Sequence, residues 1–495
     1  MPCYCGSDDP SRAMRRLRGA AVALFLGLVT AAGARAQAPA PTATPAPATA
    51  DDRLEQLERE VEAMRSQLQA LQQQQQQQQA TEAQPAAAPT PAPGAPGATP
   101  DVSELARRVD VLAEEVAAMK LGESAATVTA DEPQQGFGPA ASKVYRQEHG
   151  LSLGGYGEIL YQDFDGRRDD GSPADESDEL TLERAVVYVG YKFNDQWLFN
   201  SELEWEEGGE ENSVEFAYLD YLWRPHLNVR FGHVLMPMGF LNELHEPTVY
   251  LGAKRPLTER FIIPSTWHQS GAGLFGEAGQ LTWRTYVVTG LDASGFSAEG
   301  LREGRQEGEV NATDFAWVGR LDWTPMQGLL VGGSAYSGNS GQGLVDPDGR
   351  RVDARTSLFE GHGEWRWRGL EARALFARAH VGDAARIDAA LDLQGDASVG
   401  DEMQGWYTQV GWDVLSQRGD GHMQLIPFAR WETIDTQRSV PGGFLRNPAN
   451  DRDVLTLGLS FKPFEQTVIK LDWQDEKNAA DSGLDQWNLG IGYVF

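Results

Sequence analysis

The chain has 495 residues, which is enough for several ordinary domains or for one large barrel with appendages. Its 72 acidic and 42 basic residues give a net charge of -30, which argues against a nucleic-acid partner and is compatible with a secreted or envelope protein. Both cysteines, Cys3 and Cys5, precede the first apolar segment, so we expect no disulfide, thiol catalysis or cysteine-based metal site after it.

Residues 1–36 have the pattern of a Sec-type signal peptide. Three arginines between positions 15 and 18 precede an apolar stretch at 20–29, and Ala34-Arg35-Ala36 offers a small-residue cleavage site. The apolar stretch is about half of the ~20 residues that a transmembrane helix needs, which argues against a membrane anchor. Met14 is an alternative start, because the preceding acidic residues do not fit a basic leader.

Two short coiled coils are predicted between linkers. We expect a disordered linker at 37–50, a coiled coil at 51–80, an Ala/Pro-rich linker at 81–100, a second coiled coil at 101–121 and a connector at 122–149. The first coil has apolar residues spaced alternately by three and four, namely Leu54, Leu57, Val61, Met64, Leu68 and Leu71. The alternative is a lone amphipathic helix packed on a domain, but the proline-rich linkers leave it no such domain. The pattern therefore favours oligomerisation, although coils this short are marginal alone.

Residues 150–495 show the period-two alternation of β-strands, as in Trp197, Phe199, Ser201, Leu203 and Trp205. Sixteen strands are predicted, near 151–163, 179–193, 196–206, 213–224, 227–236, 268–279, 280–290, 313–324, 328–337, 355–367, 369–381, 403–413, 422–432, 453–462, 465–475 and 485–495. The alternation is poor at 213–224, 369–381 and 422–432.

The connections between these strands alternate between short turns and long polar loops. Loops are predicted near 164–178, 237–267, 291–312, 338–354, 382–402, 433–452 and 476–484. An even-numbered membrane barrel has this rhythm, with short turns on one rim and long loops on the other. The predicted fold class is all-β: a 16-stranded antiparallel transmembrane β-barrel preceded by a short α-helical coiled-coil region. Both ends of the barrel then fall on the short-turn, periplasmic side.

The last strand carries a candidate assembly signal. Its apolar row alternates with small or polar residues and consists of Trp487, Leu489, Ile491, Tyr493 and Phe495. Aromatic residues at both ends of such a row are typical of a strand that faces lipid and headgroups. The row also resembles the Phe-ending signal by which bacterial outer-membrane barrels are recognised for insertion; a soluble sandwich strand is the alternative.

The loop at 237–267 is long and combines apolar residues with Lys254, Arg255 and Arg260. A loop that folds back into the barrel and constricts the pore needs this mixture. An ordinary external loop, or a pair of strands, is the alternative.

Three runs carry a resemblance to a known family: FGHVLMPMGFLNELHEP (231–247), TERFIIPSTWHQSGAGLFGEAG (258–279) and LTWRTYVVTGLDASGFSAEGLREGRQ (281–306). They resemble the phosphate-selective porin O/P family over roughly 150–495. The resemblance implies a trimeric sixteen-stranded outer-membrane porin with a loop folded into its lumen and arginines along an anion pathway. By position, Arg255 and Arg260 would lie at the constriction beside Lys254.

Alternation along the strands places further cations on the lumen side, namely Arg184, Arg284, Arg320, Arg366, Arg430 and Lys470. It places carboxylates beside them, namely Glu202, Glu204, Asp322, Glu364 and Asp472, and the loop at 164–178 is acidic. Anion selectivity needs a net positive constriction. The arginines could instead pair with carboxylates across the wall, so phosphate selectivity rests on the resemblance.

The predicted function is a water-filled channel for passive diffusion of small hydrophilic solutes, with anions such as phosphate preferred. Expected partners are outer-membrane lipids, the barrel-assembly machinery, small inorganic anions and copies of the chain in a homotrimer; no cofactor, metal or catalytic residue is predicted. The alternatives are a non-selective or cation-preferring porin and an envelope tether whose coils bind periplasmic partners. A barrel enzyme is disfavoured because the eight histidines lack a spacing such as H-E-x-x-H.

Overall fold

The computed structural model describes residues 135–306, 308, 310–416 and 423–495. The predicted signal peptide, both coiled coils, their linkers and the first part of the connector lie outside the described residues. Among the residues described, no helix is long and apolar enough to cross a membrane.

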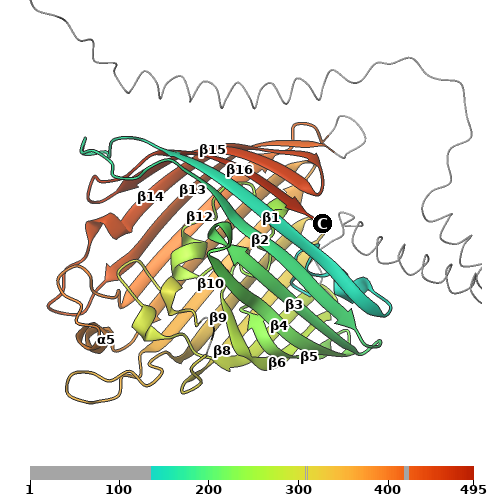
Figure 1. Cartoon of the computed structure of the whole chain (residues 1–495), viewed down its shortest axis with the longest axis horizontal. Helices are drawn as coiled ribbons and strands as arrows, with labels where there is room; N and C mark the ends of the chain where they lie inside the picture. The colour runs from blue at the N-terminus through green and yellow to red at the C-terminus, as the bar shows by residue number, and fades with distance from the viewer. Residues whose placement is uncertain (1–134, 307, 309, 417–422) are drawn as a thin grey trace, which may run out of the picture. The chain divides into compact units, whose positions relative to one another are not determined.

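The described chain forms one closed barrel of sixteen antiparallel strands (Figure 1), which confirms the predicted strand number. Each strand pairs with its neighbours in sequence, and β1 closes the barrel by pairing with β16, with Ile159 opposite Ile491. The strands are β1 (Gly150–Phe164), β2 (Glu179–Lys192), β3 (Trp197–Glu206), β4 (Glu211–Arg224), β5 (Leu227–Leu235), β6 (His268–Ala278), β7 (Leu281–Thr289), β8 (Phe315–Met326), β9 (Leu329–Asn339), β10 (Arg355–Trp367), β11 (Leu370–Val381), β12 (Glu402–Trp412), β13 (Gln424–Ser439), β14 (Asp451–Phe464), β15 (Thr467–Asn478) and β16 (Gln486–Val494).

The helical elements are short and lie outside the strand ladder. They are α4 (Lys143–Arg146), α5 (Ala384–Ala390), η1 (Glu207–Gly209), η2 (Pro247–Val249), η3 (Thr258–Ile262), η4 (Ala293–Gly295), η5 (Arg302–Gly304) and η6 (Pro448–Asn450). Two of them, η2 and η3, belong to the loop between β5 and β6, which the sequence predicts to fold inward.

Side chains alternate between the lumen and the outer face, as the period of a strand requires. In β16, Asn488 is fully buried on the inside, whereas Trp487, Ile491 and Tyr493 are exposed outside. Even-numbered strands end at the short-turn rim, where they expose large aromatic side chains, namely Trp223, Trp323, Trp367, Trp412 and Phe464. The outer face therefore carries an aromatic girdle, the feature expected of a barrel that meets headgroups.

One strand boundary departs from the prediction by more than three residues. The alternation predicts that β13 ends at 432 and that a loop follows, but the strand continues to Ser439. Its second half carries polar residues that bond to the loops that follow β7 and β11: Thr436 donates to the carbonyl of Ala298, and Gln437 donates to that of Ser398. Because the partners of this half-strand are polar loops, its sequence lacks the apolar row by which strands are recognised.

The predicted alternation of short turns and long loops also has two exceptions. Between β3 and β4, on the long-loop rim, residues 207–210 make a short connection, and residues 413–423 separate β12 from β13 on the short-turn rim. The remaining connections follow the predicted alternation.

Candidate functional site

The loop between β5 and β6 crosses the lumen and bonds to the far wall. The Tyr250 hydroxyl donates to Glu158 of β1 at 2.8 Å, the Ala253 amide to Asp472 of β15 at 2.6 Å and the Leu257 amide to Glu432 of β13 at 2.7 Å. These wall carboxylates point inward, so the prediction of an inward-folded loop is confirmed.

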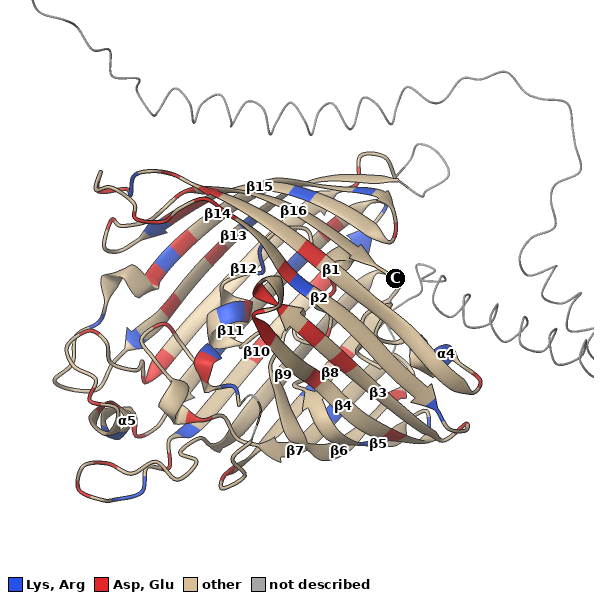
Figure 2. Ribbon diagram, in the orientation of Figure 1, with Lys and Arg blue, Asp and Glu red and all other residues tan. Residues whose placement is uncertain are grey.

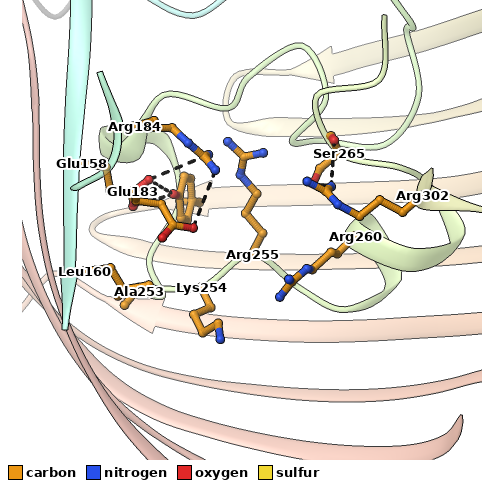
Figure 3. Close-up of a pocket in the computed structure, with 11 residues that line it drawn as sticks. Glu158, Leu160, Glu183, Arg184, Ala253, Lys254, Arg255, Arg260, Ser265 and Arg302 are labelled. Atoms are coloured by element: carbon orange, nitrogen blue, oxygen red, sulfur yellow. Dashed lines mark hydrogen bonds and ion pairs between the residues drawn. The ribbon is translucent and has the colours of Figure 1, made fainter. Parts of the chain in front are cut away.

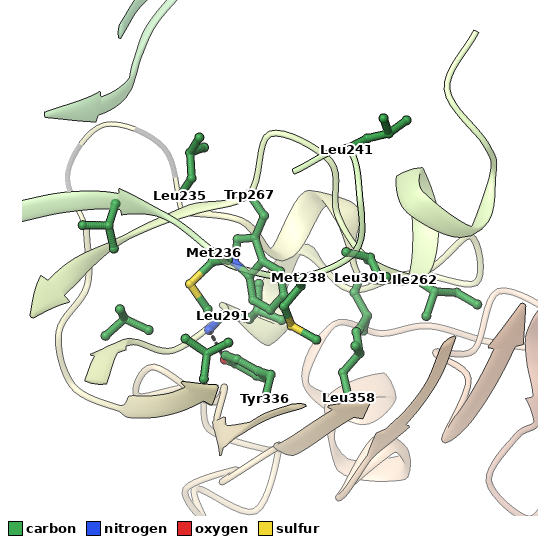
Figure 4. Packing of buried hydrophobic residues seen from close by; sticks show 14 of the residues in the cluster. Leu235, Met236, Met238, Leu241, Ile262, Trp267, Leu291, Leu301, Tyr336 and Leu358 are labelled. Carbon is green, nitrogen blue, oxygen red and sulfur yellow. Dashed lines mark hydrogen bonds between the residues drawn. The ribbon is translucent and has the colours of Figure 1, made fainter. Parts of the chain in front are cut away.

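The two ends of the loop are held together where it leaves the wall. The Asn242 amide nitrogen donates to the carbonyls of Met236 and Trp267, and the Trp267 amide returns a bond to the Asn242 side-chain oxygen. Apolar residues of the loop then pack against the inner wall (Figure 4): Met238 and the fully buried Trp267 lie with Tyr336 and Leu358. The apolar half of the loop sequence thus anchors it and leaves its basic half over the lumen.

A cavity of about 70 Å³ lies between this loop and the wall (Figure 3). It brings together four of the predicted cations, Arg184, Lys254, Arg255 and Arg260. It also holds Arg302, which the sequence reasoning missed. Arg302 lies in the loop between β7 and β8, within the run quoted for the family resemblance. That loop has the same mixture of buried apolar side chains, Leu291 and Leu301, with arginines.

Three of the cavity cations have no carboxylate partner. Within the described part of the chain, the side chains of Lys254, Arg255 and Arg260 make no ion pair, and the Nε and one Nη of Arg255 are buried without a hydrogen-bond partner. Arg260 lies beside the Phe261 ring at 5.2 Å. Like charges held this close without partners raise the free energy of the charged forms, and an anion between them lowers it.

Burial and the neighbouring positive charges lower the pKa values of this cluster. Burial and the neighbouring Arg260 lower the pKa of Lys254 to about 8. Burial, followed by Arg305, Arg260 and Arg255, lowers the pKa of Arg302 to about 9. Burial is also the largest cause of the lowered pKa of Arg260.

Arg184, although it lines the same cavity, is neutralised by the wall. Its guanidinium lies 3.1 Å from Glu206 and 3.4 Å from Glu204, with Glu183 and Glu158 at 3.8 and 4.0 Å. The cluster formed by Lys254, Arg255 and Arg260 will be called the unpaired loop cations.

The other predicted cations lie outside the cavity, and the arginines among them are paired with carboxylates. Arg284 and Arg320 bind Glu243 of the loop at 3.2 and 3.7 Å, and both also contact Asp322. These ion pairs fasten the loop to β7 and β8.

Three more predicted cations are also engaged. Arg430 lies 3.2 Å from Glu432, and the Lys470 ammonium lies 3.4 Å from the centre of the Tyr250 ring. Arg366 sits at the short-turn end of β10, pairs with Glu364 and is 54% exposed on its side chain. The strand arginines therefore pair with carboxylates of the wall or of the folded loop, which is the alternative to an anion ladder, whereas the three loop cations make no ion pair within the described residues. Figure 2 shows basic and acidic positions close together along the strands.

These features define a porin-type barrel: sixteen closed antiparallel strands, an aromatic outer rim and a loop that narrows the lumen. No protein-family model matches the chain. An uncharacterized protein of Aquifex aeolicus is 36% identical over 381 residues, which cover 73% of this chain and 84% of that protein. The chain belongs to the same family as that protein.

Solved structures with a similar fold are bacterial outer-membrane barrels. Salmonella typhi OmpF, in a complex with daunomycin, matches 71% of this chain and 99% of its own, with a TM-score of 0.47 and 11% identity. A loop-deletion mutant of the Vibrio cholerae outer-membrane protein OmpT matches 70% of this chain and 100% of its own, with a TM-score of 0.45 and 13% identity. A mutant of the Rh. blastica porin matches the same shares, with a TM-score of 0.42 and 11% identity.

Proposed function

We propose that the protein is an outer-membrane porin through which small hydrophilic anions diffuse passively. The observation that carries the proposal is the set of unpaired loop cations, which face the cavity between the inward-folded loop and the wall. A constriction that presents several unpaired positive groups concentrates anions and excludes cations. Phosphate is the proposed solute on the strength of the family resemblance.

The outer face supports a membrane location. Large apolar and aromatic side chains, such as Leu321, Phe359 and Trp365, are exposed along the outside of the strands, where a water-soluble barrel would carry polar groups. In the proposed orientation the short turns and the N-terminal region face the periplasm, the long loops face outward, and the C-terminal row assists insertion. A homotrimer is part of the proposal, because the predicted heptads favour association and the resembled family is trimeric.

The first test is the reversal potential of the purified full-length protein in a planar bilayer under a KCl gradient. We expect an anion-selective current that millimolar phosphate blocks. An anion-selective current without phosphate block would retain the channel and refute phosphate as its solute. Absence of any current would refute the channel.

A cation-preferring general porin is the second candidate, favoured by the loop between β1 and β2. This loop carries the acidic groups Asp165, Asp169, Asp170, Asp175, Glu176 and Asp178. Two of these carboxylates form ion pairs within the described residues, Glu176 with Arg168 at 2.5 Å and Asp169 with Lys477 at 2.6 Å, and six acidic groups gather in this one loop. A cation-selective reversal potential would establish this alternative, because the charge of the mouth would then outweigh that of the constriction.

Two further alternatives have weaker support. A tether function would depend on the coiled coils, which lie outside the described residues. For an enzyme, the most suggestive group is His362, which contacts both Asp322 and Glu360. The nearby Ser334 hydroxyl donates to Glu360 rather than to this imidazole, so the group lacks the serine–histidine contact that nucleophilic catalysis requires.

A further inference from the structure

The described part of the predicted connector lies inside the barrel. Residues 137–144 are nearly all buried, and Val144 is 1% exposed. A Cβ added to Gly190 of β2 would lie 2.7 Å from the Cβ of Val144, and one added to Gly154 of β1 would lie 3.1 Å from the carbonyl of Ala140. Both glycines face the lumen, since they alternate with outward residues of their strands. The wall is therefore shaped to admit this segment.

Polar side chains of the wall and the loop bind the backbone of the segment. The Asn200 amide of β3 donates to the carbonyl of Ala141 at 2.9 Å. A single carboxylate oxygen of Glu246, in the inward-folded loop, accepts from the amides of Ala140 and Ala141, both at 3.0 Å. Backbone groups of an irregular buried segment need such partners, and here the barrel supplies them.

Two aromatic side chains anchor the segment at β4 and β5. Phe137 packs against Phe216 with ring centroids 5.2 Å apart, and the Arg230 guanidinium lies 4.7 Å from the centre of the Phe137 ring. The Tyr145 hydroxyl donates to Asp220 at 2.7 Å and accepts from Arg230 at 2.8 Å. Buried aromatic anchors paired with an arginine are the residues that dominate specific protein interfaces.

The barrel closes without this segment. The ladder between β1 and β2 starts at Gly150, and β1 meets β16 from Tyr156 onward, so the pairing that closes the barrel begins after the segment. Figure 2 shows α4, the helical turn of the segment, at the end of the barrel where β1 begins. The segment can therefore leave the lumen while the sixteen-stranded ladder stays intact.

We propose that the inner faces of β1–β5 form a peptide-binding site in the lumen, occupied by the chain's own residues 136–146, which act as a plug that narrows the pore. The plug covers these five strands and reaches β7, where Gly136 lies against the Arg284 guanidinium. Residues 1–134 continue directly from the plug, so a partner that binds them is covalently connected to it. The occlusion rests on the proposed channel function; the docking does not.

The test displaces the plug by a substitution in the barrel wall that it contacts. Gly190→Ala places a methyl group against Val144, whereas the double variant Gly190→Ala/Val144→Gly removes the clash and restores the fit. Gly361→Ala is the matched control, because a Cβ added there meets nothing within 4 Å. Two readouts are measured on the full-length protein: single-channel conductance, and trypsin cleavage after Lys143 and Arg146.

We expect Gly190→Ala to expose both cleavage sites and to raise the conductance roughly 1.5-fold or more, since the plug contacts about a third of the strands that enclose the conducting lumen. The double variant and Gly361→Ala should behave as wild type. Trypsin exposure without a rise in conductance would overturn the occlusion, and unchanged cleavage in Gly190→Ala would overturn the docking.

A second variant guards against a folding defect in β2. Phe137→Ala/Tyr145→Ala removes only the anchors of the plug and leaves every strand unaltered. Both the single-channel conductance and the trypsin cleavage after Lys143 and Arg146 should increase in this variant. Wild-type-like results in this variant would refute the plug. If wild type and all variants carry no current, the channel proposal fails and the occlusion fails with it, while trypsin cleavage still decides whether the segment is docked.

Discussion

Removing two of the unpaired loop cations should reverse or abolish anion preference. We consider Arg255→Ala/Arg260→Ala, which leaves Lys254 and the wall pairs in place. In water, the electrostatic interaction of a unit charge with a permeating ion about 4 Å away is ~1 kcal/mol. Two arginines therefore stabilise an anion by on the order of 2 kcal/mol and destabilise a cation by as much. Every 1.4 kcal/mol is about tenfold in a concentration ratio. After screening by salt we expect the anion-to-cation permeability ratio to fall on the order of tenfold.

The assay is the reversal potential in a planar bilayer under a KCl gradient, which reports that ratio directly. Arg366→Ala is the control for charge removal away from the constriction, because it removes one positive charge at the exposed end of β10, where Glu364 already pairs with it. Arg255→Lys/Arg260→Lys keeps the charges and should keep the selectivity. A reversal potential in the alanine double variant equal to that of wild type would refute the assignment of the constriction.

Three further results are expected. Anion preference, measured by reversal potential, should decline between about pH 7 and pH 9. The pKa of Lys254 is lowered to about 8, so its ammonium loses its proton and its positive charge as the pH rises through this range. The pH-dependent decline should be absent in Lys254→Met. Glu243→Gln breaks the buried ion pairs with Arg284 and Arg320 and should make the free energy of docking of the loop less favourable by about 3–5 kcal/mol. Increased channel noise and proteolysis within 237–267 would report the loss. Quiet, protease-resistant channels would contradict it. Trp267→Ala should lower the free energy of unfolding by about 3–5 kcal/mol, since the side chain is fully buried; unchanged denaturation in urea would exclude its role as the loop anchor.

The architecture was readable from local patterns because each strand records its two environments in alternate residues. In β16 the exposed Trp487 and the buried Asn488 follow one another as an apolar face and a polar face require. The pattern failed in β13, where the inner partners of Thr436 and Gln437 are loop carbonyls rather than water or apolar side chains. A strand that faces folded loops does not carry the signature of a strand that faces a lumen.

The candidate site was predictable only in part. Arg255 and Arg260 stood out because they are basic residues in an apolar loop, and the structure places them together in the cavity. Alternation also places Arg284 and Arg320 on the lumen side, but it carries no information about which carboxylate each one meets. Both are bound by Glu243, which is distant in sequence and arrives with the folded loop.

The sequence by itself determined the strand number, the distinction between the two rims and the face that each strand residue occupies, because these depend on period-two alternation and on the lengths of connections. Only the tertiary structure decided which charges remain unpaired and what fills the lumen. Arg302 joins the cavity from a second loop, and residues 137–144, which read as an irregular connector, are nearly all buried and lie against inward-facing glycines. Ion pairing and occlusion depend on distances between residues remote in the chain, and a local pattern does not contain those distances.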